Sequence, residues 1–172
     1  MFGKYENFPS YVHFLKTFSS SLSNKQLQQK LIKTLKELNR KTFRFEEISI
    51  PTIPNSEIIF EFGIAEGVCF NFLDEQETNR ALDIVKTGQI TVLDFFCITR
   101  YYRHNEQEKK RVALKFDYYI FRAAFVVKAV EFQIFHKQGP RYIVPEELVT
   151  MIKNSINKTA TRGVLRENTN LP

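Results

Sequence analysis

The sequence contains no tryptophan, two cysteines, six glycines and six prolines among its 172 residues. The cysteines, Cys69 and Cys97, are too few for a disulfide framework, and neither has the close cysteine or histidine neighbour that a zinc site requires. We interpret both as structural thiols, which is typical of a reducing compartment. No segment approaches the roughly 18 apolar residues of a membrane span, and the N-terminus lacks the apolar centre of a secretory signal. We therefore expect a soluble, cytoplasmic protein with no membrane partner.

Motifs of the common enzyme classes are also missing. The sequence has no Gly-x-Ser-x-Gly, no glycine-rich phosphate loop and no His-Glu-x-x-His. The histidines, His13, His104 and His136, are too scattered to indicate a metal site, and we interpret them as structural. We therefore expect no enzymatic activity, no metal and no small-molecule cofactor.

Two carboxylates, Asp94 and Asp117, lie inside apolar segments that resemble strands. One interpretation makes them the paired carboxylates of a small nucleic-acid enzyme. The other pairs them with Arg100, Arg122 or Lys115, and we favour it because an unpaired buried carboxylate is costly.

Aromatic side chains and positive charge are what the sequence has in excess. Phenylalanine and tyrosine together make up 14% of the residues, and the formal net charge is +6. The charge is segregated, because residues 1–42 carry net +6, residues 43–87 net −6 and residues 88–142 net +5. A basic balance of this kind permits a nucleic acid or another anionic surface as partner.

The hydrophobic periodicity predicts an α+β fold. We expect a single domain over residues 1–158, with an N-terminal helical region at 10–41, a sheet region at 42–137 and a C-terminal helix at 145–158, followed by a mobile tail at 159–172. Helices are predicted near 22–40, 75–87 and 145–158, and they should pack on an antiparallel sheet of five to six strands. The longest predicted strands span 90–104, 111–125 and 130–137.

The strands predicted at 90–104 and 111–125 are apolar on both faces. Three short helices are too few to cover both faces of such a sheet. We therefore expect a homo-oligomer that buries either the remaining face or the amphipathic helix at 22–40.

Basic and aromatic residues alternate near the ends of these strands. Such a mixture suits single-stranded nucleic acid, because rings stack on bases while cations neutralise phosphates. The competing interpretation places these rings in the core, with the basic residues marking strand ends. The candidate nucleic-acid-binding residues are Arg100, Tyr101, Tyr102, Arg103, Lys115, Tyr119, Arg122, Lys137, Arg141 and Tyr142.

The segments ITVLDFFCITRYYRH, VALKFDYYIFRAAF and VEFQIFHKQGPRYIVPEELVTMI, which cover roughly the C-terminal half, resemble the archaeal ThermoDBP-related single-stranded DNA-binding proteins. The resemblance implies helices combined with an antiparallel sheet whose aromatic and basic residues form a DNA cleft, and it implies no enzymatic activity. This chain has no clear C-terminal heptad zipper, so zipper-mediated assembly does not carry over.

We therefore expect a non-enzymatic protein that binds single-stranded nucleic acid, with DNA favoured over RNA, largely without sequence preference. The first alternative is an assembly or scaffold subunit whose aromatic face meets another protein. The second is a small metal-dependent nuclease that uses Asp94, Asp117 or His136.

Overall fold

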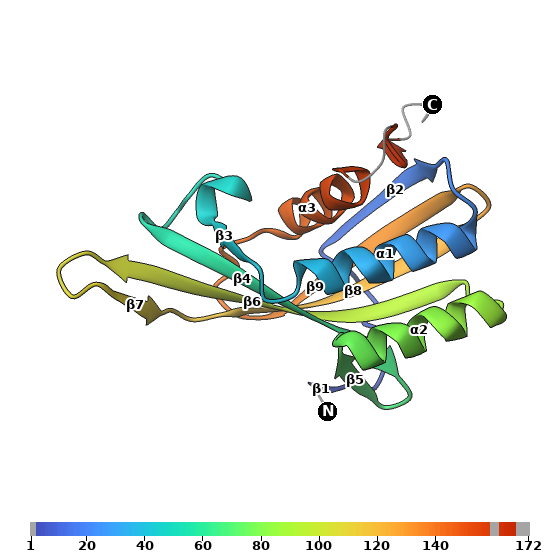
Figure 1. The fold of residues 1–172 in the computed structure, drawn as a ribbon, viewed down its shortest axis with the longest axis horizontal. Helices are drawn as coiled ribbons and strands as arrows, with labels where there is room; N and C mark the ends of the chain where they lie inside the picture. The colour runs from blue at the N-terminus through green and yellow to red at the C-terminus, as the bar shows by residue number, and fades with distance from the viewer. Residues whose placement is uncertain (1–2, 159–161, 168–172) are drawn as a thin grey trace.

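The computed structural model describes residues 3–158 and 162–167, in which antiparallel strand pairing dominates (Figure 1). The chain begins with two strands, β1 and β2, and the three α-helices are distributed along the sequence between strands. In chain order the elements are β1 (Gly3–Lys4), β2 (Phe14–Ser20), α1 (Asn24–Leu38), β3 (Thr42–Arg44), a short 3-10 helix η1 (Phe45–Glu47), β4 (Ser56–Glu66), β5 (Cys69–Phe72), α2 (Glu75–Thr87), β6 (Val92–Asn105), β7 (Lys110–Ala113), β8 (Asp117–Val126), β9 (Ala129–Gln138), α3 (Pro145–Lys158) and β10 (Leu165–Glu167).

The ten strands of the described residues form one antiparallel sheet. Their order is β1-β5-β4-β6-β8-β9-β2-β10, with β3 added to β4 and β7 added to β6. The predicted α+β class, antiparallel pairing and three helices are confirmed, but the predicted count of five to six strands is wrong. The sheet is larger because the segment predicted at 111–125 forms two strands, which gives seven from β3 to β9, and because β1, β2 and β10 extend it from outside residues 42–137.

The prediction of a helical region over residues 10–41 is wrong in its first half. Residues 14–20 form β2, which pairs with β9 so that Phe14 lies opposite Ile134 and Phe18 opposite Val130. The helix begins only after Ser23, whose hydroxyl accepts a hydrogen bond from the Gln26 amide at 3.3 Å while the Gln26 side chain accepts one from the Ser23 amide at 3.1 Å. This reciprocal cap ends the strand-forming region and starts α1.

Two further boundaries differ from expectation. The strand predicted at 111–125 is divided into β7 and β8, because the regular pairing with β6 is interrupted at residues 114–116. Within the tail predicted to be mobile, residues 159–161 and 168–172 lie outside the described residues. Residues 165–167, however, pair with β2, and Val164 and Leu165 are buried. This part of the tail is therefore held by the sheet.

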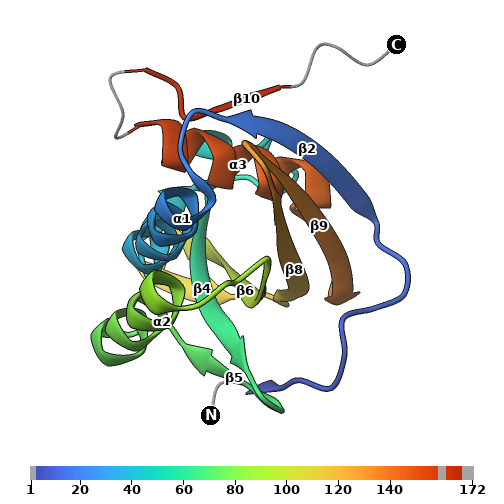
Figure 2. The same cartoon turned by 90° about the vertical axis from the view of Figure 1, so that its right-hand side faces the viewer.

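The three helices cover one face of the sheet, which we call the inner face. Figure 2 shows the sheet curving around α1, α2 and α3. The core on this face contains Leu31 and Leu35 of α1, Val85 of α2, Leu148 and Ile152 of α3, and Phe60, Phe95 and Phe121 of the sheet. None of the described helices is long and apolar enough to cross a membrane.

The opposite face, which we call the outer face, carries no helix. The N-terminal segment that joins β1 to β2 runs outside the sheet on this side (Figure 2). A second, smaller apolar cluster forms there from Phe70, Phe96, Ile98 and Ile120, with Tyr5 and Phe8 packed against it. Because side chains alternate along a strand, the odd-numbered residues of β6 and β8 point to the inner face and the even-numbered residues to the outer face.

Asp117 is the most densely hydrogen-bonded group of the inner face, although it is fully buried. Its carboxyl oxygens accept from the backbone amides of Arg141 at 2.6 Å and Tyr142 at 3.0 Å, and from the Tyr101 hydroxyl. The ring nitrogen Nε2 of His136 lies 2.7 Å from Oδ1 of the same carboxyl. These bonds tie the start of β8 to the turn that follows β9, and they satisfy a polar group whose burial is otherwise costly.

We predict that Gly139→Ala destabilises the protein more than Gly67→Ala does. Both glycines have a positive φ, +116° and +58°, which costs a side chain roughly 1 kcal/mol or more. A Cβ at Gly139 would also lie 2.4 Å from the Phe116 carbonyl oxygen and 2.5 Å from Asp117 Oδ1, whereas nothing lies within 4 Å at Gly67. Chemical denaturation of both variants measures the difference, and equal losses of unfolding free energy would contradict the close packing of the turn on Asp117.

Candidate nucleic-acid interface

A row of four aromatic rings crosses the outer face. Phe70 stacks on Phe96 at a centroid distance of 5.2 Å, Phe96 stacks on Tyr118 at 5.4 Å, and Phe116 meets Tyr118 edge-on at 5.0 Å. Exposure increases along the row, because Phe70 and Phe96 are buried, Tyr118 is half-buried and Phe116 is 37% exposed. We call these four residues the aromatic row, and its exposed end is available to a planar ligand.

The exposed end of the aromatic row borders a pocket of about 460 Å³. Its walls come from residues 115–118, where the chain re-enters the sheet, and from the turn after β9 that Asp117 holds. We call it the Tyr118 pocket, and it is lined by Lys115, Phe116, Tyr118, Gln138, Gly139 and Pro140.

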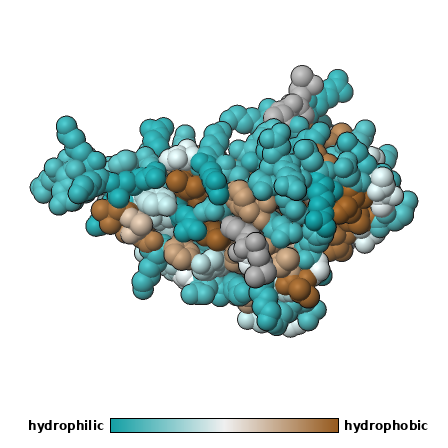
Figure 3. All heavy atoms as spheres, turned by 60° about the horizontal axis from the view of Figure 1, so that its bottom comes forward, coloured by the Kyte–Doolittle hydropathy of each residue, from teal (hydrophilic) through white to brown (hydrophobic). Residues whose placement is uncertain are grey.

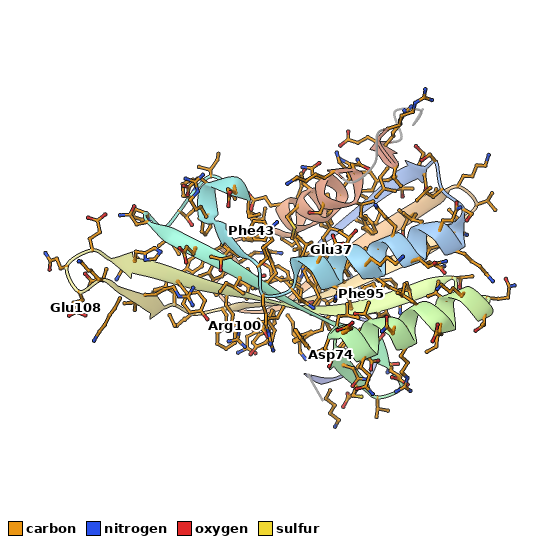
Figure 4. The ribbon with its side chains drawn as sticks, in the orientation of Figure 1. Glu37, Phe43, Asp74, Phe95, Arg100 and Glu108 are labelled. Atoms are coloured by element: carbon orange, nitrogen blue, oxygen red, sulfur yellow. The ribbon has the colours of Figure 1, made fainter. Side chains whose placement is uncertain are left out.

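Arg100 and Arg122, on the outer face, are already paired. Arg122 donates to both oxygens of Asp94, from Nε at 2.7 Å and from Nη2 at 2.8 Å, and Arg100 donates to Glu61. These hydrogen bonds raise the pKa of each arginine above its ordinary value. Figure 4 shows Arg100 on the side of the sheet away from α1. The paired arginines position neighbouring rings, since the Arg100 guanidinium lies 5.3 Å from the Phe116 centroid.

Two lysines supply the positive charge that remains beside the aromatic row. Lys115 lines the Tyr118 pocket, and the ammonium of Lys137 lies 6.0 Å from the Phe96 centroid. Both lysines are exposed, and within the described part of the chain neither has a carboxylate at ion-pair distance. They are therefore free to contact an anion.

Tyr101 and Tyr119 do not belong to this surface, contrary to the sequence-based prediction. They are 1% and 0% exposed, their rings face the helices, and their hydroxyls donate to Asp117 and to the Ile143 carbonyl oxygen. Burial raises the pKa of each phenol well above its ordinary value. Since odd-numbered residues of β6 and β8 face inward, neither ring is able to stack on a base.

The remaining predicted residues are divided between the two faces. Tyr102 is half-buried on the outer face, beneath the Arg111 guanidinium at 4.3 Å, whereas the neighbouring Arg103 points to the other side of β6. Tyr142 packs edge-on against Tyr101 on the inner side, and Arg141 is an exposed residue of the turn. Of the ten predicted residues, the outer face brings together Arg100, Tyr102, Lys115, Arg122 and Lys137.

Sequence reasoning missed the rings that form the site, namely Phe70, Phe96, Phe116 and Tyr118. The available signal was strand parity, because Arg100 and Tyr102 share a face with Phe96 and Ile98. In the next strand the same alternation would have identified Tyr118, but the break between β7 and β8 was not predicted. Figure 3, which brings the lower side of Figure 1 forward, shows apolar patches among hydrophilic surface.

The structure also separates the residues considered for catalysis. Asp94 lies on the outer face with Arg122, while Asp117 is buried on the inner face with His136. The two carboxylates therefore do not form a pair across a substrate. Within the described residues, no three His, Cys, Asp or Glu side chains gather in a way that would hold a metal ion.

The N-terminal arm, residues 3–13, is attached to the outer face by Tyr5. The Tyr5 hydroxyl donates to Asp94, its ring packs edge-on against Phe70 at 4.7 Å, and its amide donates to the Val68 carbonyl at 2.9 Å. Further along the arm, the Phe8 ring lies 4.2 Å from the Arg122 guanidinium. The arm thus covers part of the apolar outer face.

We predict a pH-dependent contribution of Tyr5 to stability. Burial, followed by the hydrogen bond to Asp94, raises the pKa of Tyr5 from 10.0 to about 12. A pKa raised in the folded state gives stability that is fully present below pH 10 and is lost as the pH rises to about 12. The difference in unfolding free energy between wild type and Tyr5→Phe should therefore become smaller as the pH rises over that interval. The exposed Tyr11→Phe variant is the control. A difference that does not change with pH would contradict the assignment.

Comparisons of the chain with family models, with curated proteins and with solved structures each found no match. The resemblance to the ThermoDBP-related proteins therefore stays a prediction, and the function is argued from the site alone.

Proposed function

We propose that the protein binds single-stranded nucleic acid, with DNA favoured, on its outer face, and that it catalyses no reaction there. The observation that carries the proposal is the exposed end of the aromatic row, Phe116 and Tyr118, flanked by Lys115 and Lys137, which have no ion-pair partner among the described residues. Bases stack on aromatic rings whatever their identity, and lysines contact phosphates without reading sequence. Binding is therefore expected to show little sequence preference.

Single strands are favoured over duplexes by the same geometry. In a duplex the bases are already stacked on one another, so their faces are not available to Phe116 and Tyr118. In a single strand they are free to stack. The proposal includes a cytoplasmic location, which the free thiols of Cys69 and Cys97 support.

The stacking contact is tested by Phe116→Leu, which removes the ring and keeps an apolar side chain. We expect it to weaken oligonucleotide binding by roughly 1–3 kcal/mol, the range for one base–aromatic stack. The matched control is Phe43→Leu, at a half-buried ring on the inner side of β3, which is labelled in Figure 4. Fluorescence titration measures both variants, and equal affinities for the two would count against stacking at Phe116.

The phosphate contacts are tested by the salt dependence of binding. Lys115→Gln and Lys137→Gln should each reduce the slope of log affinity against log salt by about 0.7, the value for one phosphate of a single strand. Exposed Lys33 of α1 provides the control, because it lies on the opposite side of the molecule. If Lys33→Gln changed the slope as much as the other two, the charge effect would be general and not a property of the outer face.

Association with another protein, including a second copy of this chain, is the second candidate function. Val126 and Val127, at the turn between β8 and β9, are 58% and 87% exposed, and exposed aliphatic residues favour protein contacts. The homo-oligomer expected from the sequence stays a prediction. The N-terminal arm covers part of the face that an oligomer was expected to bury. Light scattering of wild type and Val127→Ser separates a monomer from an oligomer that uses this turn.

A further inference from the structure

We infer that the N-terminal arm roofs a second base-binding pocket and clamps a nucleic-acid strand against the outer face. The inference rests on the proposed function and adds a second contact point to it. The pocket measures about 350 Å³, at the small end of the ~300–1,000 Å³ typical of small-molecule sites. It is lined by Lys4, Tyr5, Glu6, Asn7 and Pro9 from the arm and by Ile120, Phe135 and Lys137 from the sheet.

The chemistry of this arm pocket suits a nucleobase. Tyr5 and Phe135 provide aromatic lining, and Ile120 provides an apolar wall from β8. The Phe135 ring is itself stacked on His13 at a centroid distance of 4.8 Å. The exposed amide of Asn7 has both a donor and an acceptor for the edge of a base. Lys137 supplies a cation without an ion-pair partner in the described residues, whereas Lys4 is paired with Glu6 at 3.4 Å. The pocket therefore offers aromatic, polar and positively charged contacts together.

The arm pocket and the Tyr118 pocket are linked by a chain of side-chain contacts. Lys137 lines the arm pocket, and its ammonium lies over Phe96, which stacks on Tyr118 at the edge of the other pocket. A single-stranded nucleic acid with one base in each pocket would therefore place its phosphate backbone beside Lys137.

The N-terminal arm covers the arm pocket through contacts that a bound nucleic acid could displace. Beyond the short pairing of β1 with β5, the arm is attached by Tyr5, which contacts Asp94, Val68 and Phe70, and by Phe8 on Arg122. At its far end, the rings of Tyr11 and His13 pack on Phe135. Asp94 also accepts from Arg122, so one carboxylate joins both attachments. Entry of a strand from the side requires the arm to lift, and its return encloses the bound strand. A duplex is too wide to be enclosed in this way.

Photo-crosslinking of the full chain tests the inference. Oligothymidines that carry a single 5-iodouracil at successive positions are bound, irradiated and digested, and the crosslinked residue is identified by mass spectrometry. We expect crosslinks to Tyr5 or Phe135 from some positions and to Phe116 or Tyr118 from others. Crosslinks confined to Phe116 and Tyr118 would overturn the arm pocket and leave the proposed function intact. Absence of binding to any oligonucleotide at low salt would overturn both.

A variant gives an independent measure. Phe135→Leu removes one aromatic wall and should weaken binding of a long oligonucleotide about tenfold, the effect of losing one stacked base. It should also abolish crosslinks to Tyr5 while leaving those to Tyr118. Phe43→Leu is again the matched control, and thermal unfolding verifies that each variant is folded. Unchanged affinity and an unchanged crosslink pattern in folded Phe135→Leu would refute the pocket.

Discussion

The buried carboxyl group of Asp117 determines the geometry around which the outer face is arranged. It accepts hydrogen bonds from the amides of Arg141 and Tyr142 and from the Tyr101 hydroxyl, with His136 at 2.7 Å. These contacts hold the turn at Gly139 against the start of β8, and that turn forms one wall of the Tyr118 pocket. A group wholly on the inner face thus shapes the site on the outer face.

Along β6 and β8, residues that build the core alternate with residues of the proposed binding surface. Odd-numbered residues of β6 and β8, such as Tyr101 and Tyr119, anchor the core, while even-numbered ones, such as Phe96 and Tyr118, form the aromatic row. Adjacent tyrosines that look equivalent in the sequence therefore have different roles. The register shift of β9 between its pairings with Tyr118 and Tyr119 adjoins Lys137, whose ammonium reaches the outer face.

The basic residues of the outer face fall into two groups, arginines in ion pairs and lysines proposed to contact phosphates. Arg100 and Arg122 are paired with Glu61 and Asp94, and they order the rings of Phe116 and Phe8 beside them. Lys115 and Lys137, whose side chains are flexible and strongly hydrated, have no ion-pair partner in the part of the chain that the structure describes. This division suits the proposed binding of single strands by stacking and phosphate contacts, which does not need the bidentate arginine contacts that read base edges.

The amino-acid pattern alone determined the three helices and the antiparallel α+β class, because periodicity and capping are local effects. The cost of burying charge predicted a cationic partner for Asp94, which is Arg122, but it wrongly predicted an arginine or lysine partner for Asp117, whose partners are Tyr101, His136 and two backbone amides. The tertiary structure alone decided that residues 14–20 are a strand, since β2 exists by pairing with β9, more than a hundred residues away. It also decided which tyrosines are exposed. The alternation of a strand gives two faces, but only the position of the helices determines which face is covered.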